Sequence, residues 1–190
     1  MRLLADKEMA PVASAIVAEM NARDAKVPDL YRMLANAPNL LKAWTEIAWP
    51  LRAEDLTPRD LRELLIMRTA LLTQAQYEWT HHWGLALTAG VAMDKLHALA
   101  DWSMSDRFSE QERAALAFTD ALVETGKVPQ ETFRALADRL DAGQLIHLAL
   151  TVSFYVCVAR MVLAFELDLE PGYQNVPALP PYPKRPRSPI

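Results

Sequence analysis

Apolar residues recur at helical spacing along most of the chain. Val12, Ile16 and Met20 are separated by four residues each, which predicts a helix over 8–22. Proline is favoured at the first position of a helix, so Pro28 and Pro38 predict two short helices over 28–36 and 38–49. We expect Pro50 to end or kink the second of these, because proline has no amide hydrogen to donate.

The central part of the chain contains a strong pair of helix signals. Thr57-Pro58-Arg59-Asp60 offers a hydroxyl, a proline and an acid at a helix start, which predicts a helix over 58–73. A second helix is expected over 75–89, closed by Gly90. A weaker helix is expected over 93–101. Because the turn near Thr73 is short, the first two helices should pack antiparallel.

Three further helices are predicted toward the C-terminus. Ser109 and Glu112 form a capping box, and the helix that they start should end before Gly126. Pro129 opens a helix that runs to about Leu140. Asp141 with Gln144 starts the last and longest helix, to about Glu166. No segment alternates apolar and polar residues as a strand does, so the expected fold class is all-α.

The last helix is apolar enough to raise the alternative of a membrane span. However, His147 and Arg160 lie within 145–165, and an arginine inside a lone span costs several kcal/mol. We therefore expect a helix buried on all sides in an oligomeric bundle. Cys157 should then be an inert packing residue among apolar neighbours.

Composition limits the classes of function. The chain has 190 residues, 52% hydrophobic and 23% charged, which suits a folded domain with a real core. A net charge of −4 argues against nucleic-acid and anionic-membrane partners. One cysteine excludes an internal disulfide or a CxxC pair, and no apolar leader follows Met1, so we expect a cytoplasmic protein.

Proline use divides the chain into a folded part and a tail. Seven of the thirteen prolines fall in 171–189, so we expect one all-α domain over 1–170 and an extended C-terminal tail over 171–190. Such a tail is disordered, or it is attached to a neighbouring subunit through Tyr173, Leu179 and Tyr182.

Candidate chemistry is concentrated in the middle of the chain. Glu78 and His82 are four residues apart on the helix predicted over 75–89, so they share one face. Tyr77 and His81 share the next face, about 100° away. If the two central helices pack antiparallel, Glu63 on the first comes close to Glu78 and His82. Two carboxylates and an imidazole together are a recurring way to move protons near neutral pH.

Other interpretations of these residues remain open. The Glu78–His82 pair also fits a simple surface contact worth a few tenths of a kcal/mol. Glu63, Glu78, His81 and His82 are all metal-ligand types, but adjacent histidines point about 100° apart on a helix, so no metal is expected. The isolated His97 and His147 are expected to be structural.

Arg160 needs an anionic partner if it is buried in the apolar last helix. The partner could be Glu63, Glu78, a residue of another subunit or a substrate carboxylate. A structural salt bridge is the favoured interpretation.

The stretch from Asp60 to His82, with Tyr77-Glu78-Trp79 three residues before a histidine, resembles the core of the carboxymuconolactone decarboxylase family. That family also contains the AhpD-like alkylhydroperoxidases. The resemblance continues through Gly90-Val91 and through Phe154–Arg160, and so covers about 38–170. It implies an AhpD-like all-α domain built around a helical hairpin. It also implies homo-oligomers, trimers or hexamers, with active sites near subunit interfaces.

The resemblance also indicates which branch of the family this chain follows. Its peroxidases carry a glutamate, a CxxC pair and a histidine in fixed spacing. Glu63 matches the glutamate and His82 the histidine, but Ala75 and Glu78 stand at the cysteine positions. Peroxide reduction by that route needs thiols, so the acid–base residues are kept without the redox residues.

The resulting hypothesis is a cofactor-independent lyase that resembles 4-carboxymuconolactone decarboxylase and acts on a small organic acid or lactone of aromatic-compound catabolism. His82 is the expected proton donor, Glu78 orients or recharges it, and Glu63 is the second acid–base group. The residues expected to contact substrate are Tyr77, Trp79, His81 and Arg160. Two alternatives are a peroxidase that uses Cys157 with an external thiol and a non-catalytic helical oligomer.

Overall fold

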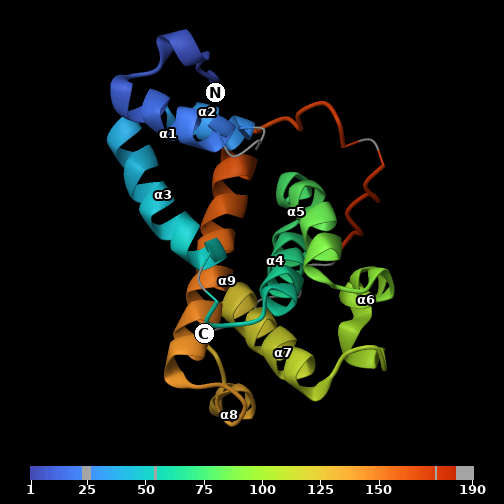
Figure 1. Cartoon of the computed structure of the whole chain (residues 1–190). Coiled ribbons are helices and arrows are strands. Elements are labelled where there is room, and N and C mark those ends of the chain that lie inside the picture. The colour runs from blue at the N-terminus through green and yellow to red at the C-terminus, as the bar shows by residue number, and fades with distance from the viewer. Residues whose placement is uncertain (23–26, 54, 174, 183–190) are drawn as a thin grey trace. The chain divides into compact units, whose positions relative to one another are not determined.

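The helix signals of the sequence correspond to helices in three dimensions. The structure, a computed structural model, describes residues 1–22, 27–53, 55–173 and 175–182 (Figure 1). Every regular element in these ranges is helical, which confirms the all-α prediction. The α-helices are α1 (Pro11–Ala22), α2 (Asp29–Leu34), α3 (Pro38–Ala53), α4 (Arg59–Thr73), α5 (Gln76–Ala89), α6 (Met93–Ala98), α7 (Glu110–Thr125), α8 (Gln130–Ala137) and α9 (Ala142–Ala164), with 3₁₀ turns η1 (Asp6–Glu8) and η2 (Leu99–Met104).

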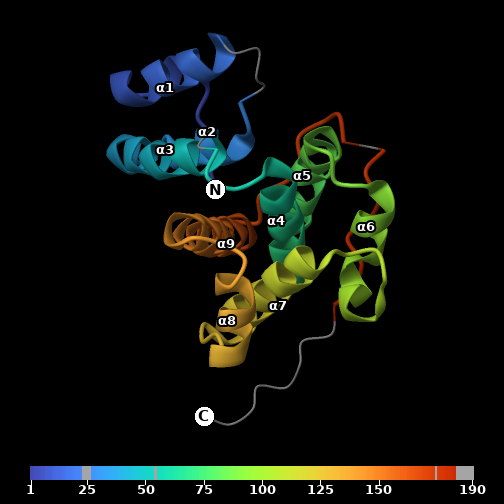
Figure 2. The same ribbon diagram turned by 60° about the horizontal axis from the view of Figure 1, so that its bottom comes forward.

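The chain forms two compact units. The first comprises Met1–Glu54 and Val162–Gln174, and the second comprises Asp55–Met161 and Asn175–Ile190, so α9 contributes to both. In the first unit α1 packs against α3, as Figure 2 shows. Glu170 of the same unit accepts a hydrogen bond of 2.6 Å from the backbone amide of Asp29.

Pro50 does not end α3 where the sequence predicts. The helix continues to Ala53 with Pro50 inside it. Because Pro50 lies in the last turn, its missing amide hydrogen removes only one helical hydrogen bond, which the remaining turns tolerate. The expected end at residue 49 is therefore wrong by one turn.

The second unit is built on the predicted antiparallel hairpin of α4 and α5, which lie side by side in Figure 1. The chain reverses at Gln74, which adopts a left-handed conformation (φ 57°) and donates its amide to the last carbonyls of α4. Every residue from Leu61 to Leu72 is buried. The helix α4 is thus the central helix of this unit, and polar side chains on it must find partners inside.

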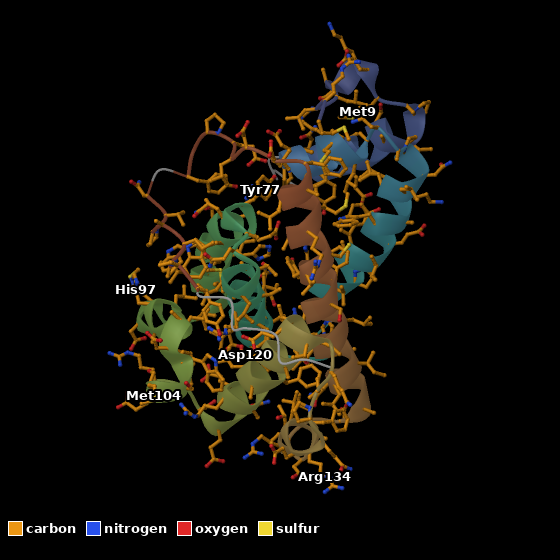
Figure 3. The ribbon with its side chains drawn as sticks, turned by 180° about the vertical axis from the view of Figure 1, so that it is seen from behind. Met9, Tyr77, His97, Met104, Asp120 and Arg134 are labelled. Atoms are coloured by element: carbon orange, nitrogen blue, oxygen red, sulfur yellow. The ribbon has the colours of Figure 1, made fainter. Side chains whose placement is uncertain are left out.

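Arg68 on α4 is an example of a satisfied buried charge. Its guanidinium forms two hydrogen bonds with the Asp120 carboxylate of α7, at 2.7 and 2.8 Å. It also donates to the carbonyl of Leu99 in η2, at 2.8 Å. Trp102 of η2 donates to the same carboxylate at 3.1 Å. This network links α4, α7 and η2 around Asp120, which Figure 3 labels.

The capping boxes predicted from sequence are confirmed. Ser109 accepts the amide of Glu112, whose carboxylate accepts the amide of Ser109, at the start of α7. Asp141 and Gln144 make the same reciprocal pair at the start of α9. The helix α7 ends at the left-handed Gly126 (φ 72°), as expected.

Among the described residues, α9 alone is long and apolar enough to cross a membrane by those criteria, and half of its most apolar stretch is buried within the protein. Leu148 and Val152 of α9 belong to the core of the second unit. The helix therefore contributes to the core of the second unit.

In the single chain α9 has one exposed face. Ile146, Leu150, Ser153, Cys157 and Arg160 are all exposed. Their spacing of four and three residues puts them on one face. The burial predicted for α9, Cys157 and Arg160 concerns an oligomer, which would cover this face, and it stays a prediction.

Residues 175–182 of the C-terminal tail pack against the second unit of their own chain. Val176, Leu179 and Tyr182 contact its hydrophobic core. Leu179 and Tyr182 therefore pack on their own chain, and a contact with a neighbouring subunit stays a prediction. Tyr173 is half-buried in the first unit, where burial and then the Glu170 carboxylate raise the pKa of its phenol. Residues 174 and 183–190 of the predicted tail lie outside the described residues.

Candidate functional site

The hairpin brings three of the predicted residues together. Glu63 lies in the second turn of α4, and Glu78 and His82 lie one turn apart on α5. His82 Nδ1 is 2.8 Å from Glu63 Oε2, with both side chains only 7% exposed. An ionised carboxylate only accepts hydrogen bonds, so Nδ1 carries the hydrogen that is donated. The second ring nitrogen, Nε2, is then the one that faces other partners.

Glu78 faces this second nitrogen. Its Oε2 lies 3.7 Å from His82 Nε2, and the Glu78 side chain is 6% exposed. This distance is too long for a direct hydrogen bond. A proton can pass between the two atoms after a small side-chain movement or through one bridging water. The imidazole thus lies between two buried carboxylates, one bonded directly and one just beyond contact. The expectation from helix spacing that the three side chains meet agrees with this geometry.

Tyr155 is a fourth member of this cluster that sequence reasoning missed. Its ring, on the buried face of α9, meets the His82 ring edge-on, with centroids 4.9 Å apart and an interplanar angle of 88°. Tyr155 is 2% exposed. Elements α4, α5 and α9 therefore each restrain the imidazole. The apolar run of α9 carries no pattern that distinguishes Tyr155 from its neighbours, so only the packing reveals it.

Arg59 is the cation at the exposed edge of the cluster. Its Nε lies 3.8 Å from Glu63 Oε1, and its side chain is 56% exposed. Arg62, one turn into α4, is buried and donates to the carbonyl of Thr57. Burial, and next the neighbouring Arg59, lower the pKa of the Arg62 guanidinium. Arg59 is thus the guanidinium that combines contact with Glu63 and access to solvent.

Arg160 pairs with neither Glu63 nor Glu78 in the single chain. It is exposed on α9, and no described residue pairs with it as a salt bridge. Its presumed burial was the reason for assigning it an anionic partner. The reason no longer holds in the single chain.

The aromatic residues of α5 have different surroundings. Tyr77 is buried and stacks on His81, with ring centroids 4.1 Å apart. His81 Nδ1 lies 2.8 Å from the Tyr77 carbonyl oxygen, so Nδ1 donates and the ring is fixed over the preceding turn. Trp79 is 1% exposed, and its indole donates to the Pro177 carbonyl at 2.9 Å. Trp79 packs in the core of the second unit, and its expected contact with a substrate stays a prediction.

The other histidines occupy structural positions. His147 is buried, with Nδ1 3.1 Å from the Thr57 hydroxyl. His97 packs its ring against Trp83, with centroids 5.4 Å apart. In the described ranges, no group of three or more His, Cys, Asp or Glu side chains has an arrangement suited to a metal ion.

Part of the chain matches the model of a known protein family. Residues 38–121 match the model of the carboxymuconolactone decarboxylase family. This match assigns the region 38–121 to the carboxymuconolactone decarboxylase family. The matched range contains Glu63, Glu78 and His82, whereas Tyr155 lies outside it. A comparison with curated proteins gave no match.

Solved structures show the same AhpD-like fold. The AhpD core of an uncharacterised peroxidase-related protein from Ralstonia eutropha JMP134 superposes with a TM-score of 0.79 at 17% identity, over 90% of this chain and 92% of that one. The debrominase Bmp8, in complex with 2,3,4-tribromopyrrole, gives 0.76 at 23% identity, over 89% and 90%. A peroxidase-related protein from Silicibacter sp. TM1040 gives 0.76 at 13% identity, over 87% and 90%. These TM-scores establish a shared fold. The members of the carboxymuconolactone decarboxylase family are enzymes.

Proposed function

We propose that this carboxymuconolactone decarboxylase family protein is a cofactor-independent lyase that removes CO2 from a small carboxylated lactone or related organic acid. One observation carries the proposal. A buried imidazole donates to one carboxylate through Nδ1 and faces a second carboxylate through Nε2. This is an arrangement for delivering a proton to a defined place near neutral pH.

The chemistry of decarboxylation needs such a group. When the bond to the carboxylate carbon breaks next to a conjugated carbonyl, its electron pair passes into a dienolate and CO2 leaves. The dienolate must then receive a proton on carbon. In the proposed mechanism His82 Nε2 donates this proton, and the Glu63 carboxylate holds the ring and its hydrogen on Nδ1 throughout. Glu78, opposite Nε2, then passes a proton taken up from solvent to His82, so each turnover consumes one proton from solvent.

The distances favour roles for Glu63 and Glu78 that are the reverse of those expected from the sequence. Glu63 makes the 2.8 Å contact that orients the ring, and Glu78 lies at the nitrogen that exchanges its proton. Arg59, at the exposed edge of the cluster, replaces Arg160 as the proposed contact for a substrate carboxylate.

The position of Cys157 weighs against a thiol peroxidase. Tyr155 contacts His82 from the buried face of α9. Cys157 lies two residues further, about 200° around the helix, and is exposed. A reaction at its sulfur would therefore proceed away from the imidazole that is expected to supply the proton.

The test is a comparison of two reactions on one protein preparation. Carboxylated γ-lactones and their acyclic dicarboxylate counterparts are incubated with the protein, and released CO2 is measured. Peroxide consumption with a dithiol reductant is measured in parallel. We expect CO2 release that is lost in His82→Ala and kept in Cys157→Ser. Peroxide reduction that is lost in Cys157→Ser, without CO2 release, would contradict the proposal.

We also propose that the protein acts as a homo-oligomer, a trimer or hexamer. Ile146 and Leu150 are 60% and 44% exposed on α9 in the single chain, which is unusual for two large apolar residues one turn apart. Sedimentation at micromolar concentration should show the assembly. A stable monomer would contradict it.

A further inference from the structure

The first turn of α5 carries Glu78 yet begins without a side-chain cap. Ala75 precedes the helix and has no oxygen to accept from the amides of the first turn, and no side-chain cap bond is formed. Such helix starts are prone to fraying, since the first amides lack carbonyl partners within the helix. Glu78 is nevertheless required to face His82 Nε2 from this turn. Something other than a cap must fix its position.

The C-terminal segment 176–182, here called the strap, is attached to that turn. The indole of Trp79 donates to the Pro177 carbonyl at 2.9 Å, and the amide of Leu179 donates to Gln76 Oε1 at 3.1 Å. These two α5 residues lie on either side of Glu78 in sequence. Figure 3 shows the strap alongside the end of α5 that Tyr77 marks.

Two more contacts strengthen this attachment. The Gln76 side chain, while accepting from the strap, donates to the Thr80 hydroxyl at 2.8 Å, and so links the strap to the next turn. Gln74, in the turn before α5, donates to the Pro180 carbonyl at 3.1 Å. The strap thus makes three hydrogen bonds with residues at the start of α5, where a capping side chain would make one.

The C-terminal end of the strap, at Tyr182, is attached to other helices of the second unit. The Tyr182 hydroxyl donates to Glu124 of α7 at 3.1 Å, and its ring lies 5.0 Å from the Arg68 guanidinium of α4. These two contacts lie on α7 and α4. They offer a matched control, because their loss should loosen the strap's end without releasing the first turn of α5.

We propose that the strap is a positioning element for the acid–base site, and that Trp79 and Gln76 are the positioning residues through which it fixes Glu78. The proposal rests on the proposed function for the importance of Glu78. The gap of 3.7 Å between Glu78 Oε2 and His82 Nε2 makes the position critical. It is short enough for proton exchange after a small movement, and a displacement of about one ångström outward removes that possibility.

The experiment tests whether the strap fixes the first turn of α5, and it uses the full-length chain. Trp79→Phe removes the indole donor and keeps an aromatic ring. Leu179→Pro removes the strap amide that bonds Gln76 and changes nothing on α5. Tyr182→Phe is the control. Each variant is examined by amide hydrogen exchange at residues 79–82 and by the NMR resonance of the His82 Cε1–H group at fixed pH.

We expect amide exchange at residues 79–82 to be at least tenfold faster in Trp79→Phe and Leu179→Pro, with a displaced His82 resonance in both. Tyr182→Phe should leave both readouts unchanged even if its unfolding midpoint falls. If Trp79→Phe does not fold, Leu179→Pro decides the question. Exchange within twofold of the parent in Leu179→Pro, or an equal effect of Tyr182→Phe, would overturn the proposal. Neither readout depends on turnover. The strap result can therefore stand if the proposed reaction is wrong, and the proposed reaction can stand if the strap result is negative.

Discussion

Replacing Glu63 with glutamine is expected to slow turnover by about tenfold to a hundredfold while the fold persists. The carboxylate Oε2 lies 2.8 Å from His82 Nδ1, and both side chains are buried. Glutamine has nearly the same shape, so the packing between α4 and α5 is kept. What is lost is the negative charge on the group that accepts the hydrogen bond from Nδ1.

The magnitude follows from the kind of hydrogen bond. A bond to a charged group contributes about 1.5–3 kcal/mol and a neutral one about 0.5–1.5 kcal/mol, so the exchange removes roughly 1–1.5 kcal/mol. About 1.4 kcal/mol corresponds to tenfold in rate. A further loss arises if the amide turns its NH2 toward Nδ1, because the imidazole hydrogen must then move to Nε2 in the neutral ring. The two effects together set the expected range.

The assay is the rate of CO2 release at saturating substrate, with urea unfolding measured on the same samples. Glu112→Gln, a carboxylate-to-amide change on α7 outside the site, is the control for the chemical nature of the substitution. Turnover of Glu63→Gln within twofold of the parent would refute the orienting role assigned to Glu63. A loss of stability above about 3 kcal/mol would show instead that the charge supports the fold.

Three further outcomes are expected. Asp120→Asn should lower the free energy of unfolding by about 3 kcal/mol, measured by urea denaturation, because it leaves the buried Arg68 charge without its carboxylate; a loss below 1 kcal/mol would contradict this. Burial opposes ionisation of Glu112, but hydrogen bonds from Lys95 and from the start of α7 outweigh it and lower its pKa. The stabilisation is therefore present at neutral pH and is lost as pH falls below about 4.5, so Glu112→Gln should be about 1 kcal/mol less stable at pH 7 and equal to the parent in strong acid. Tyr155→Leu should reduce CO2 release by about tenfold, since an edge-on ring contact contributes about 0.5–1.5 kcal/mol to holding His82, and unchanged kinetics would show that α9 does not restrain the imidazole.

Local signals in the sequence were sufficient to predict most helices. Capping boxes at Ser109 and Asp141, and the left-handed ends at Gly90 and Gly126, depend on a few neighbouring residues. The meeting of Glu78 with His82 was predictable for the same reason, since helix geometry alone puts them on one face.

The features that the sequence did not predict depend on contacts between distant segments. The face of α9 that is exposed in the single chain could not be told from the buried face, because apolar residues lie on nearly all sides of the helix. Tyr155 reaches His82 only through the packing of α9. The strap contact of Trp79 joins residues 98 positions apart in the chain. No local pattern reports such contacts, because they depend on how the helices pack.

The central claim is that His82, between Glu63 and Glu78, supplies the proton of a decarboxylation. The most direct measurement is the turnover number for CO2 release from carboxylated γ-lactones by the parent, His82→Ala and Glu78→Gln, with helical content checked by circular dichroism. The account predicts a fall of at least about 10²-fold in each variant at unchanged helicity. CO2 release within twofold of the parent in folded His82→Ala would contradict it.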